Sequence, residues 1–320
     1  MVKALGLFSG GLDSILAIKV LEEQNIKVLA LSFVSPFFGD KEKLTKIAKD
    51  NNIDLKILDI STDYLKMLRS PKFGYGKNLN PCVDCKILMV KEAQEYAKKH
   101  GYAFVFTGEV VGQRPMSQVK HKLNLIKNQA GELLRPLSAK LLPETSFERN
   151  GLVDREKLFS INGRGRSGQF KLVKRYKVKE FSSPSGGCLL TEKGYCHKLQ
   201  DFLNYTKNNN LNDIKLLKLG RHFRKDKNKF IVSRNEKENN EILNLKNKEE
   251  YIFQVQDQKG PIVLLLGKVT AKAINLAAQL AWSYAPKSVS DVVMYKNDKI
   301  NKKIKVQKIE KEKFKTLMIT

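Results

Sequence analysis

The segment Ser9-Gly10-Gly11-Leu12-Asp13-Ser14 constrains the fold more than any other stretch of the chain. It follows an apolar run at residues 4–8, which is typical of a buried parallel strand, and it opens an amphipathic run at residues 15–24, which predicts a helix. A strand that turns directly into a helix leaves the first N–H groups of the helix without partners, and the positive end of the helix dipole faces the turn. We therefore expect an anion there.

The residue types in this turn suit a phosphate. Gly10 and Gly11 have no Cβ to keep a phosphate away from the backbone, and the hydroxyls of Ser9 and Ser14 add donors. The carboxylate of Asp13 fits best beside a Mg²⁺ ion or as a helix cap. A plain Gly-Gly turn with an N-cap residue is the alternative. The segment lacks the lysine of the GxxxxGK[ST] loop, which excludes that nucleotide cradle.

The segment resembles the SGGxDS loop of the ATP pyrophosphatase (PP-loop) superfamily. Members of this superfamily cleave ATP between the α and β phosphates to adenylate a substrate, and they thiolate tRNA or amidate nucleotides. The resemblance implies ATP and Mg²⁺ as cofactors and an ATP-binding role for Ser9, Gly10, Gly11, Asp13 and Ser14. It leaves the substrate open.

Strands and helices alternate after the turn. Apolar runs at residues 28–34 and 55–58 flank a charged helical segment at residues 41–51, and residues 103–107 form another buried run before a helical segment at 119–128. This alternation predicts a parallel sheet covered on both faces, with ligands beyond the carboxyl ends of its strands. We expect an α/β domain with a Rossmann-like sheet, similar to the adenine nucleotide α hydrolase fold that the resemblance implies.

The charge of the chain predicts a polyanionic partner. Its 59 Lys and Arg outnumber 33 Asp and Glu, which gives a net charge of +26. A lysine-rich genome composition is the competing explanation. No signal peptide is recognised, and apolar runs such as residues 262–266 fall far short of the roughly 20 residues of a membrane span. We expect a cytoplasmic protein that binds nucleic acid and no membrane.

The four cysteines are not expected to form disulfides in the cytoplasm. Cys82 and Cys85 precede a helical run at residues 86–99, where the helix dipole should favour their thiolates. Cys188 ends a Pro- and Gly-rich turn that should leave its thiol accessible, whereas Cys196 is expected to be an ordinary buried thiol.

Three interpretations of these thiols remain open. In the first, Cys82, Cys85 and Cys188 hold an iron-sulfur cluster (4Fe-4S) with one open iron that binds sulfide. In the second, Cys85 and Cys188 are a persulfide and its resolving thiol. In the third, Cys196 joins the other three in a structural zinc site.

A longer series of segments is similar to the catalytic core of tRNA 4-thiouridine synthetases. The series spans about residues 3–140 and comprises Cys85-Lys86, Met89, Ala93, Ala97, Thr107-Gly108-Glu109, Gly112-Gln113, Ser117-Gln118 and Leu134-Arg135-Pro136-Leu137. The resemblance implies that Cys85, Cys188 and Asp13 are catalytic and that Gly108 and Gln113 contact ATP. We recognise no N-terminal tRNA-binding module and no C-terminal rhodanese-like module, so the sulfur donor and the modified position stay open.

A basic segment at residues 162–180 separates this core from Cys188. We expect Arg164, Arg166, Lys174 and Arg175 to contact nucleic acid from a flexible loop that orders on binding. A solvated surface loop is the alternative.

The run Asn208-Asn209-Asn210 predicts the boundary between a thiolation domain, residues 1–208, and a second domain, residues 209–320. Its pattern predicts a helix at residues 271–284 and strands at residues 214–219, 230–233, 251–255, 262–266, 289–295 and 304–309. We therefore expect an α+β domain.

Several segments of this second domain resemble the RNA-binding domain of ribosome-quality-control (NFACT-type) factors. They are Gly220-Arg221, Ser233-Arg234-Asn235, Glu238-Asn239, residues 257–261, and residues 277–281 with Tyr284. The resemblance implies phosphate contacts for Arg221, Arg224 and Arg234. Trp282 lies on an apolar helix and is expected to be core rather than a stacking platform.

These features together predict an ATP-dependent tRNA uridine sulfurtransferase. It would adenylate a uracil carbonyl and replace the oxygen with sulfur from sulfide or a cysteine desulfurase. The rivals are a PP-loop amidating ligase with structural zinc and an RNA-binding protein with a vestigial nucleotide loop. The choice of carbonyl and the existence of a homodimer stay open.

Overall fold

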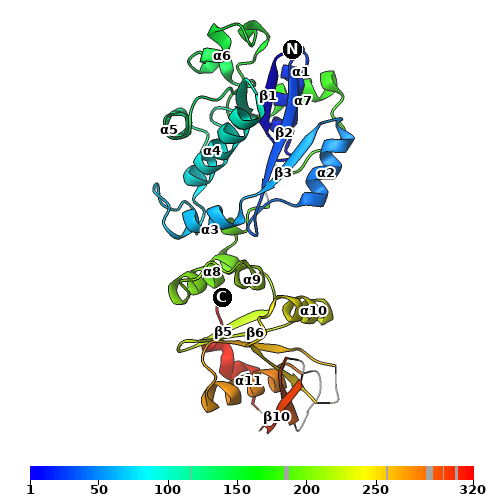
Figure 1. The fold of residues 1–320 in the computed structure, drawn as a ribbon, viewed down its shortest axis with the longest axis vertical. Coiled ribbons are helices and arrows are strands. Elements are labelled where there is room, and N and C mark those ends of the chain that lie inside the picture. Colours follow the sequence, from blue (N-terminus) through cyan, green and yellow to red (C-terminus); the bar gives the residue numbers. More distant parts are fainter. Residues whose placement is uncertain (116, 184–186, 257–258, 286–290, 298, 307–308) are drawn as a thin grey trace. The chain divides into compact units, whose positions relative to one another are not determined.

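The computed structural model describes the chain except for residues 116, 184–186, 257–258, 286–290, 298 and 307–308. The described residues form two compact units, Met1–Thr191 and Glu192–Thr320 (Figure 1). Helix α8 (Lys193–Tyr205), which the sequence assigned to the first domain, lies in the second unit. Its Asp201 forms ion pairs with Arg224 and Lys229 of that unit. None of the described helices combines the length and the apolar character needed to cross a membrane.

The first unit is built on a parallel sheet of four strands in the order β3-β2-β1-β4. The strands are β1 (Lys3–Leu7), β2 (Lys27–Val34), β3 (Leu55–Asp59) and β4 (Phe104–Thr107). Their apolar side chains are buried because helices cover both faces. The predicted Rossmann-like parallel sheet is confirmed.

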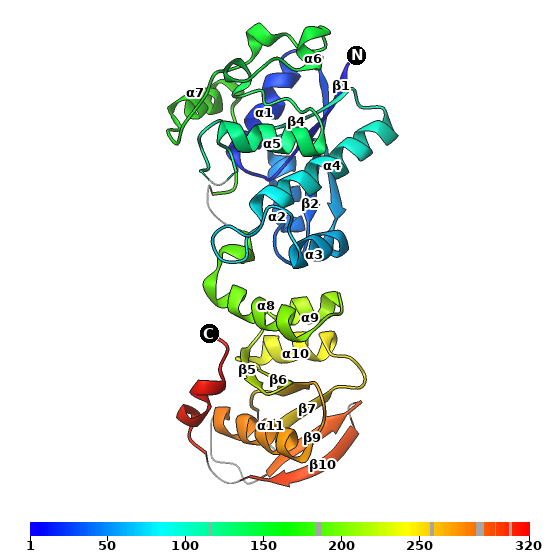
Figure 2. The same cartoon turned by 90° about the vertical axis from the view of Figure 1, so that its left-hand side faces the viewer.

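Helices cover the two faces of this sheet (Figure 2). Helices α1 and α2 share one apolar core with Leu172 of α7, whereas α4 and α5 share another on the opposite face. Helix α1 is buried on most of its surface because it lies between the sheet and α7. The helices of this unit are α1 (Leu12–Glu22), α2 (Lys41–Asp50), α3 (Ser61–Arg69), α4 (Cys82–His100), α5 (Lys120–Ala130), α6 (Ser146–Arg149) and α7 (Ser167–Tyr176).

The second unit is a six-stranded antiparallel sheet in the order β10-β9-β7-β8-β6-β5. The strands are β5 (Arg221–Lys225), β6 (Asn228–Val232), β7 (Tyr251–Val255), β8 (Val263–Leu266), β9 (Asp291–Lys296) and β10 (Lys299–Lys305). Helix α11 (Ala271–Tyr284) packs on one face, and α10 (Glu236–Leu245) with the end of α9 (Leu211–Leu216) packs on the other. The predicted α+β architecture is confirmed, and Trp282 packs against the α11 core as expected.

The strand predicted at residues 214–219 is wrong. The chain forms helix α9 there, because the side chain of Asn210, interpreted above as part of a linker, caps that helix by accepting the N–H of Asn212 at 2.9 Å. The strands predicted at 289–295 and 304–309 fall partly outside the described residues, and β10 begins earlier than predicted, at Lys299.

Strand β1 packs closely against β4 because Gly6 has no side chain. Gly6 is paired with Phe106 in the parallel register, and a Cβ at Gly6 would lie 2.4 Å from Cζ of the Phe106 ring. A buried ring cannot move away cheaply. The two strands therefore depend on glycine at this position.

Replacing Gly6 by Ala should lower the free energy of unfolding by about 1–3 kcal/mol, the usual cost of overpacking a core. The matched control is Gly168→Ala on α7, where the nearest atom to the added methyl would lie at 3.6 Å. That variant should be neutral or stabilising by up to about 1 kcal/mol because Ala favours helix. Urea unfolding followed by far-UV circular dichroism measures both. Equal stabilities of the two variants would contradict the packing argument.

Candidate active site

The turn from β1 into α1 has the geometry of an anion site. Gly10 has a φ of +70°, and Gly11 is the N-cap of α1 without any side-chain cap. Among the described residues, no acceptor lies within hydrogen-bond distance of the N–H groups of Leu12 and Asp13. The hydroxyl of Ser14 donates to the Gly11 carbonyl at 2.7 Å, and Ser9 Oγ accepts the Gly11 N–H at 3.4 Å. This geometry favours a phosphate over the plain capped turn.

Gly108 is needed because the end of β4 approaches this turn very closely. A Cβ on Gly108 would lie 2.4 Å from the carbonyl carbon and oxygen of Asp13, and 2.6 Å from the Ser14 nitrogen. The sequence predicted an ATP contact for Gly108. The geometry gives it a packing role, since only glycine lets the two segments meet.

Buried polar side-chain atoms without hydrogen-bond partners lie next to the turn and in the segment after β4. The Gln113 Nε2, Gln118 Oε1 and Gln169 Oε1 atoms are buried without a hydrogen-bond partner among the described residues. Gln169 reaches Asp13 with its other amide atom, because Nε2 donates to Oδ1 at 3.3 Å. Buried polar atoms normally have partners, so these atoms fit a polar ligand such as ATP.

Glu109 connects the turn to the helix that carries Cys85. Its buried carboxylate forms ion pairs with Arg135 (3.2 Å, Nε to Oε2) and with Lys86 (3.6 Å, Nζ to Oε1). Burial by itself would raise the pKa of Glu109, but Lys86 and Arg135 outweigh it and the pKa is lowered. Lys86 follows Cys85 directly in α4. The sequence marked these residues only as parts of a family segment and gave them no role.

Cys85, Cys82 and Cys188 lie in one neighbourhood around Tyr64. The Tyr64 hydroxyl is buried without a hydrogen-bond partner among the described residues, and its proximity to Cys85 lowers the pKa of that thiol, whereas negative charge on Cys188 or Cys82 would raise it. The same three thiols, after burial, raise the pKa of Tyr64. Tyr64, on α3, was not predicted as a site residue.

Hydrogen bonds on both sides of Cys188 hold it near the turn. Before it, Ser182 donates its N–H to the Gly10 carbonyl at 2.7 Å. After it, Leu189 donates its N–H to the Phe37 carbonyl at 2.9 Å, and the Phe37 ring lies 5.4 Å from that of Tyr64. The predicted close turn at residues 183–187 lies largely outside the described residues. The segment around Cys188 therefore links the phosphate turn to the neighbourhood of Cys85.

The expectation that the helix N-terminus favours thiolates is wrong. Desolvation by the surrounding protein raises the pKa of Cys85 to about 12 and also raises that of Cys82, although both thiols keep some exposed surface. The Cys85 N–H already donates to the Pro81 carbonyl at 2.8 Å, so it is not free to stabilise a thiolate.

The predicted four-cysteine zinc site would join cysteines of both units. No three His, Cys, Asp or Glu side chains among the described residues are arranged to hold one metal ion. Cys196 is buried in α8 of the second unit, as predicted for an ordinary thiol. The proximity of Cys85 and Cys188 suits a persulfide pair, and the cluster and zinc interpretations stay predictions.

The basic segment is not the flexible loop that we expected. Residues 167–176 form α7, because Leu172 is buried in the core shared with α1 and Gln169 reaches Asp13. Arg166 lies 4.0 Å from the Asp13 carboxylate, and Arg175 pairs with Glu23. Arg164 and Lys174 are exposed.

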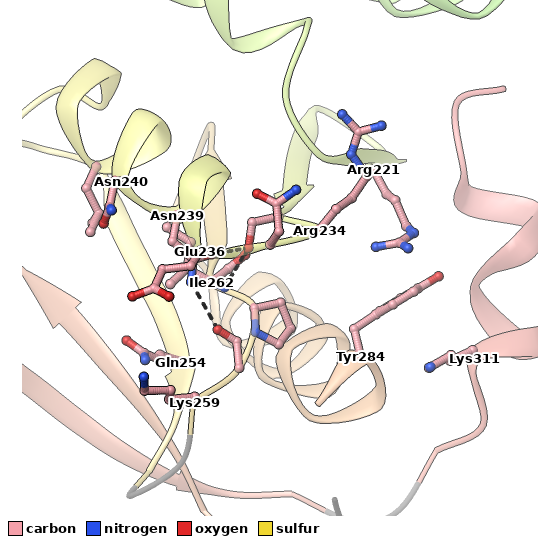
Figure 3. A pocket seen from close by; sticks show the side chains of 15 residues that line it. Arg221, Arg234, Glu236, Asn239, Asn240, Gln254, Lys259, Ile262, Tyr284 and Lys311 are labelled. Atoms are coloured by element: carbon pink, nitrogen blue, oxygen red, sulfur yellow. Dashed lines mark hydrogen bonds between the residues drawn. The ribbon is translucent and has the colours of Figure 1, made fainter. Parts of the chain in front are cut away.

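The arginines predicted to contact phosphates in the second unit differ in their partners. Arg224 binds both carboxylate oxygens of Asp201 and lies over the Tyr205 ring at 4.1 Å, which is a structural role. Arg234 is more accessible and pairs with Glu238. Arg221 lies over the Tyr284 ring, and Arg221 and Arg234 line a cavity of about 550 Å³ (Figure 3).

Two family models match the chain. The model described as thiamine biosynthesis protein (ThiI) matches residues 1–140, and the model described as NFACT protein RNA binding domain matches residues 220–318. The two predicted family resemblances are confirmed. The ThiI segment contains the phosphate turn, Cys82, Cys85 and Glu109, whereas Cys188 lies outside both matched segments.

The chain is also similar to two proteins of Methanocaldococcus jannaschii and to a 4-thiouridine synthetase. An uncharacterised protein is 26% identical over 125 residues, which are 38% of this chain and 43% of that protein, so the chain spans less than half of its relative. A solved structure of a predicted subunit of tRNA methyltransferase has 13% identity and a TM-score of 0.32, with 48% of this chain and 74% of that chain covered. A 4-thiouridine synthetase solved with RNA and bound ATP has 18% identity and a TM-score of 0.36, with 68% of this chain and 52% of that chain covered.

Replacing Glu109 by Gln should lower the free energy of unfolding at pH 7 by about 3–5 kcal/mol, because Arg135 is then left buried without its partner. The pKa of Glu109 is lowered in the folded state from 4.5, so its contribution is present above that pH and is lost as the pH falls through the folded pKa. The variant should therefore lose less stability on acidification than the parent protein.

The control for this variant is Glu156→Gln, whose carboxylate pairs with Lys140 but is 85% exposed. It should change the free energy of unfolding by less than about 1 kcal/mol. Urea unfolding at pH 7 and at pH 4 checks both variants. A Glu109→Gln protein as stable as the control would contradict the stabilising role of the buried ion pair between Glu109 and Arg135.

Proposed function

We propose that this chain is an ATP-dependent tRNA uridine sulfurtransferase, with its reaction centre at the carboxyl end of the parallel sheet. One observation carries the proposal. The phosphate turn, through Gly108 and Glu109 on one side and through Ser182 on the other, is connected to both Cys85 and Cys188. A nucleotide-activating site and a sulfur-bearing site next to each other are what thiolation requires.

ATP would bind with its phosphates against the uncapped start of α1. The N–H groups of Leu12 and Asp13 and the hydroxyl of Ser9 would donate to phosphate oxygens, as at other helix N-termini. Asp13 would help to hold Mg²⁺, which neutralises phosphate charge when it is bound. Arg166 and Gln169 contact Asp13 in the described state, and they would have to release it or share it with the metal.

The first step would be adenylation of the base. A carbonyl oxygen of uracil attacks the α phosphate, the bond to the β phosphate breaks, and pyrophosphate leaves. The step is needed because an oxide is a very poor leaving group, whereas AMP departs readily. Closure of the site against water would protect the adenylated base from hydrolysis.

The second step would replace AMP by sulfur, with Cys85 and Cys188 as the reacting thiols. In the persulfide version, the outer sulfur on Cys188 attacks the activated carbon and AMP leaves. Cys85 then attacks the inner sulfur, which forms a Cys85–Cys188 disulfide and leaves sulfur on the base, and an external thiol reductant restores the pair. Tyr64 would hydrogen-bond to the Cys85 sulfur as it becomes a thiolate.

In the cluster version, Cys82, Cys85 and Cys188 would hold a 4Fe-4S cluster that supplies an open iron for sulfide. The three thiols fit the ligand count of such a site, and the buried Tyr64 hydroxyl would donate a hydrogen bond to the Cys85 sulfur. The persulfide version needs sulfane sulfur from a cysteine desulfurase, whereas the cluster version needs sulfide.

The second unit would hold the tRNA. It matches an RNA-binding family model, and Arg221 and Arg234 line its cavity. The exposed Arg164 and Lys174 of the basic segment would add phosphate contacts. A cytoplasmic location and a homodimer remain predictions.

Separate assays of the two steps test the proposal. Cys85→Ser and Cys188→Ser should keep tRNA-dependent release of pyrophosphate but lower the formation of thiolated uridine by roughly a hundredfold or more, because each removes a reacting sulfur. Cys196→Ala is the control and should keep both activities, since Cys196 is buried in the second unit. Nucleoside mass spectrometry measures the product. Thiolation that survives Cys188→Ser, or no RNA-dependent pyrophosphate release at all, would refute the proposal.

Cys82→Ala separates the two sulfur chemistries. If the three thiols hold a cluster, anaerobically prepared protein contains about four irons per chain, and the variant loses both iron and thiolation. If Cys85 and Cys188 act as a persulfide pair, the protein is iron-free and the variant keeps most of its activity. Iron-free parent protein that is inactivated by Cys82→Ala would contradict both versions.

A further inference from the structure

The second unit contains a cavity of the size of a small-molecule site. Its volume is about 550 Å³, within the range of roughly 300–1,000 Å³ that is usual for ligand pockets. Its walls come from the start of β5, the segment after β6, α10, β7, the segment before β8, the end of α11 and the start of the 3-10 helix Lys311–Leu317. Ile262 lies between the two ends of the cavity (Figure 3).

One end of the cavity is cationic. Arg221 and Lys311 lie 5.1 Å and 5.2 Å from the centre of the Tyr284 ring, which stands between them (Figure 3). Among the described residues, neither cation has a carboxylate within ion-pair distance, whereas Arg234 beside them is paired with Glu238. Two unpaired cations around one phenol make a site for a phosphate. Because both cations contact the ring, Tyr284 positions them and is not itself a stacking surface.

The opposite end of the cavity carries amides, a carboxylate and the ammonium group of Lys259. Figure 3 shows Asn240, Gln254 and Glu236 on this side, away from Tyr284. The side-chain amides of Asn240 and Gln254 have no hydrogen-bond partner among the described residues. Asn239 by contrast is fixed, because it accepts from Ser233 and donates to the Gly260 carbonyl at 3.2 Å. These groups offer both donors and acceptors, as the edge of a base requires.

We propose that this cavity holds one unstacked nucleotide of a single-stranded RNA segment. Its phosphate lies at the Tyr284 end of the cavity, beside Arg221 and Lys311, and the edge of its base faces Asn240, Gln254 and Glu236. Proteins read RNA sequence mainly from unstacked bases, whose edges are free to hydrogen-bond, and amide side chains match such edges. The inference rests on the proposed RNA-holding role of the second unit and is independent of the thiolation chemistry.

Binding of short RNA to the full chain tests the phosphate end. The probes are 5′-phosphorylated single-stranded hexanucleotides, and the variants are Arg221→Gln and Lys311→Gln. Each should weaken binding roughly tenfold, since each removes a charged contact to phosphate. The matched control is Lys237→Gln on α10, whose side chain is 86% exposed and outside the cavity. It should change the affinity less than about twofold.

The base end has a separate test. Asn240→Ala and Gln254→Ala should change the ratio of affinities for hexanucleotides of A, C and U, while the phosphate variants should weaken all of them alike. Asn240 is exposed, so its replacement keeps the test valid even if Gln254→Ala does not fold. Competition adds a third arm, in which uridine monophosphate should displace the probe at lower concentration than inorganic phosphate.

Three results would overturn the inference: phosphate variants that bind like Lys237→Gln, an affinity ratio that neither amide variant changes, or inorganic phosphate that competes as well as the nucleotide. These outcomes are distinct from those of the thiolation assays. Hexanucleotide binding that responds as expected in a protein without thiolation activity would support this inference and refute the proposed function. If the protein thiolates tRNA but its cavity variants bind hexanucleotides normally, the proposed function is supported and this inference is refuted.

Discussion

The close approach of Gly108 to the Asp13 backbone is the constraint on which the site depends. It brings the end of β4 against the start of α1, so the residue after Gly108 must also be buried. That residue is Glu109, and a carboxylate buried there needs the cations of Arg135 and Lys86. Lys86 belongs to the first turns of α4, so the ion pair places Cys85 at the same edge of the sheet as the phosphate turn.

Desolvation dominates the chemistry of the thiols. A helix N-terminus is worth about 0.3–1 kcal/mol to a nearby anion, whereas the rise in the pKa of Cys85 from 9.0 to about 12 corresponds to roughly 4 kcal/mol against the thiolate. Cys85 therefore stays a thiol until something supplies charge or hydrogen bonds. In the proposed mechanism, a hydrogen bond donated by Tyr64, together with a bound metal or a persulfide, would supply them.

The sequence predicted those helices and strands that show a clear hydrophobic period with polar residues at both ends. The boundaries of β7 and α11 match the predicted ones because each apolar run is bounded by polar residues and carries one clear period. Strand β5 was missed because Arg and Lys surround its buried His222 and Phe223, and α10 was missed because its cap, Asn235, was interpreted only as part of a family segment. Asn210 was misjudged in the same way, since an Asn run suits a linker as well as a cap.

Some parts of the candidate site could be predicted from the sequence, and others could not. The phosphate turn and the cysteines were recognisable because their residue types and spacing are contiguous in the sequence. The Glu109 ion pairs, the position of Tyr64 and the contact of Gln169 with Asp13 depend on the tertiary packing of distant elements. No pattern in the sequence shows that α7 packs on α1, and its basic residues gave the opposite impression of a free loop.

The central claim is that the phosphate turn, Cys85 and Cys188 form one site. A bifunctional thiol reagent tests it directly in a full chain in which Cys82 and Cys196 are replaced by Ala. Peptide mass spectrometry should find Cys85 bridged to Cys188 within one chain, and Mg²⁺ with ATP should slow the bridging several-fold. Cysteines that are modified singly, at rates that ATP does not change, would contradict the account.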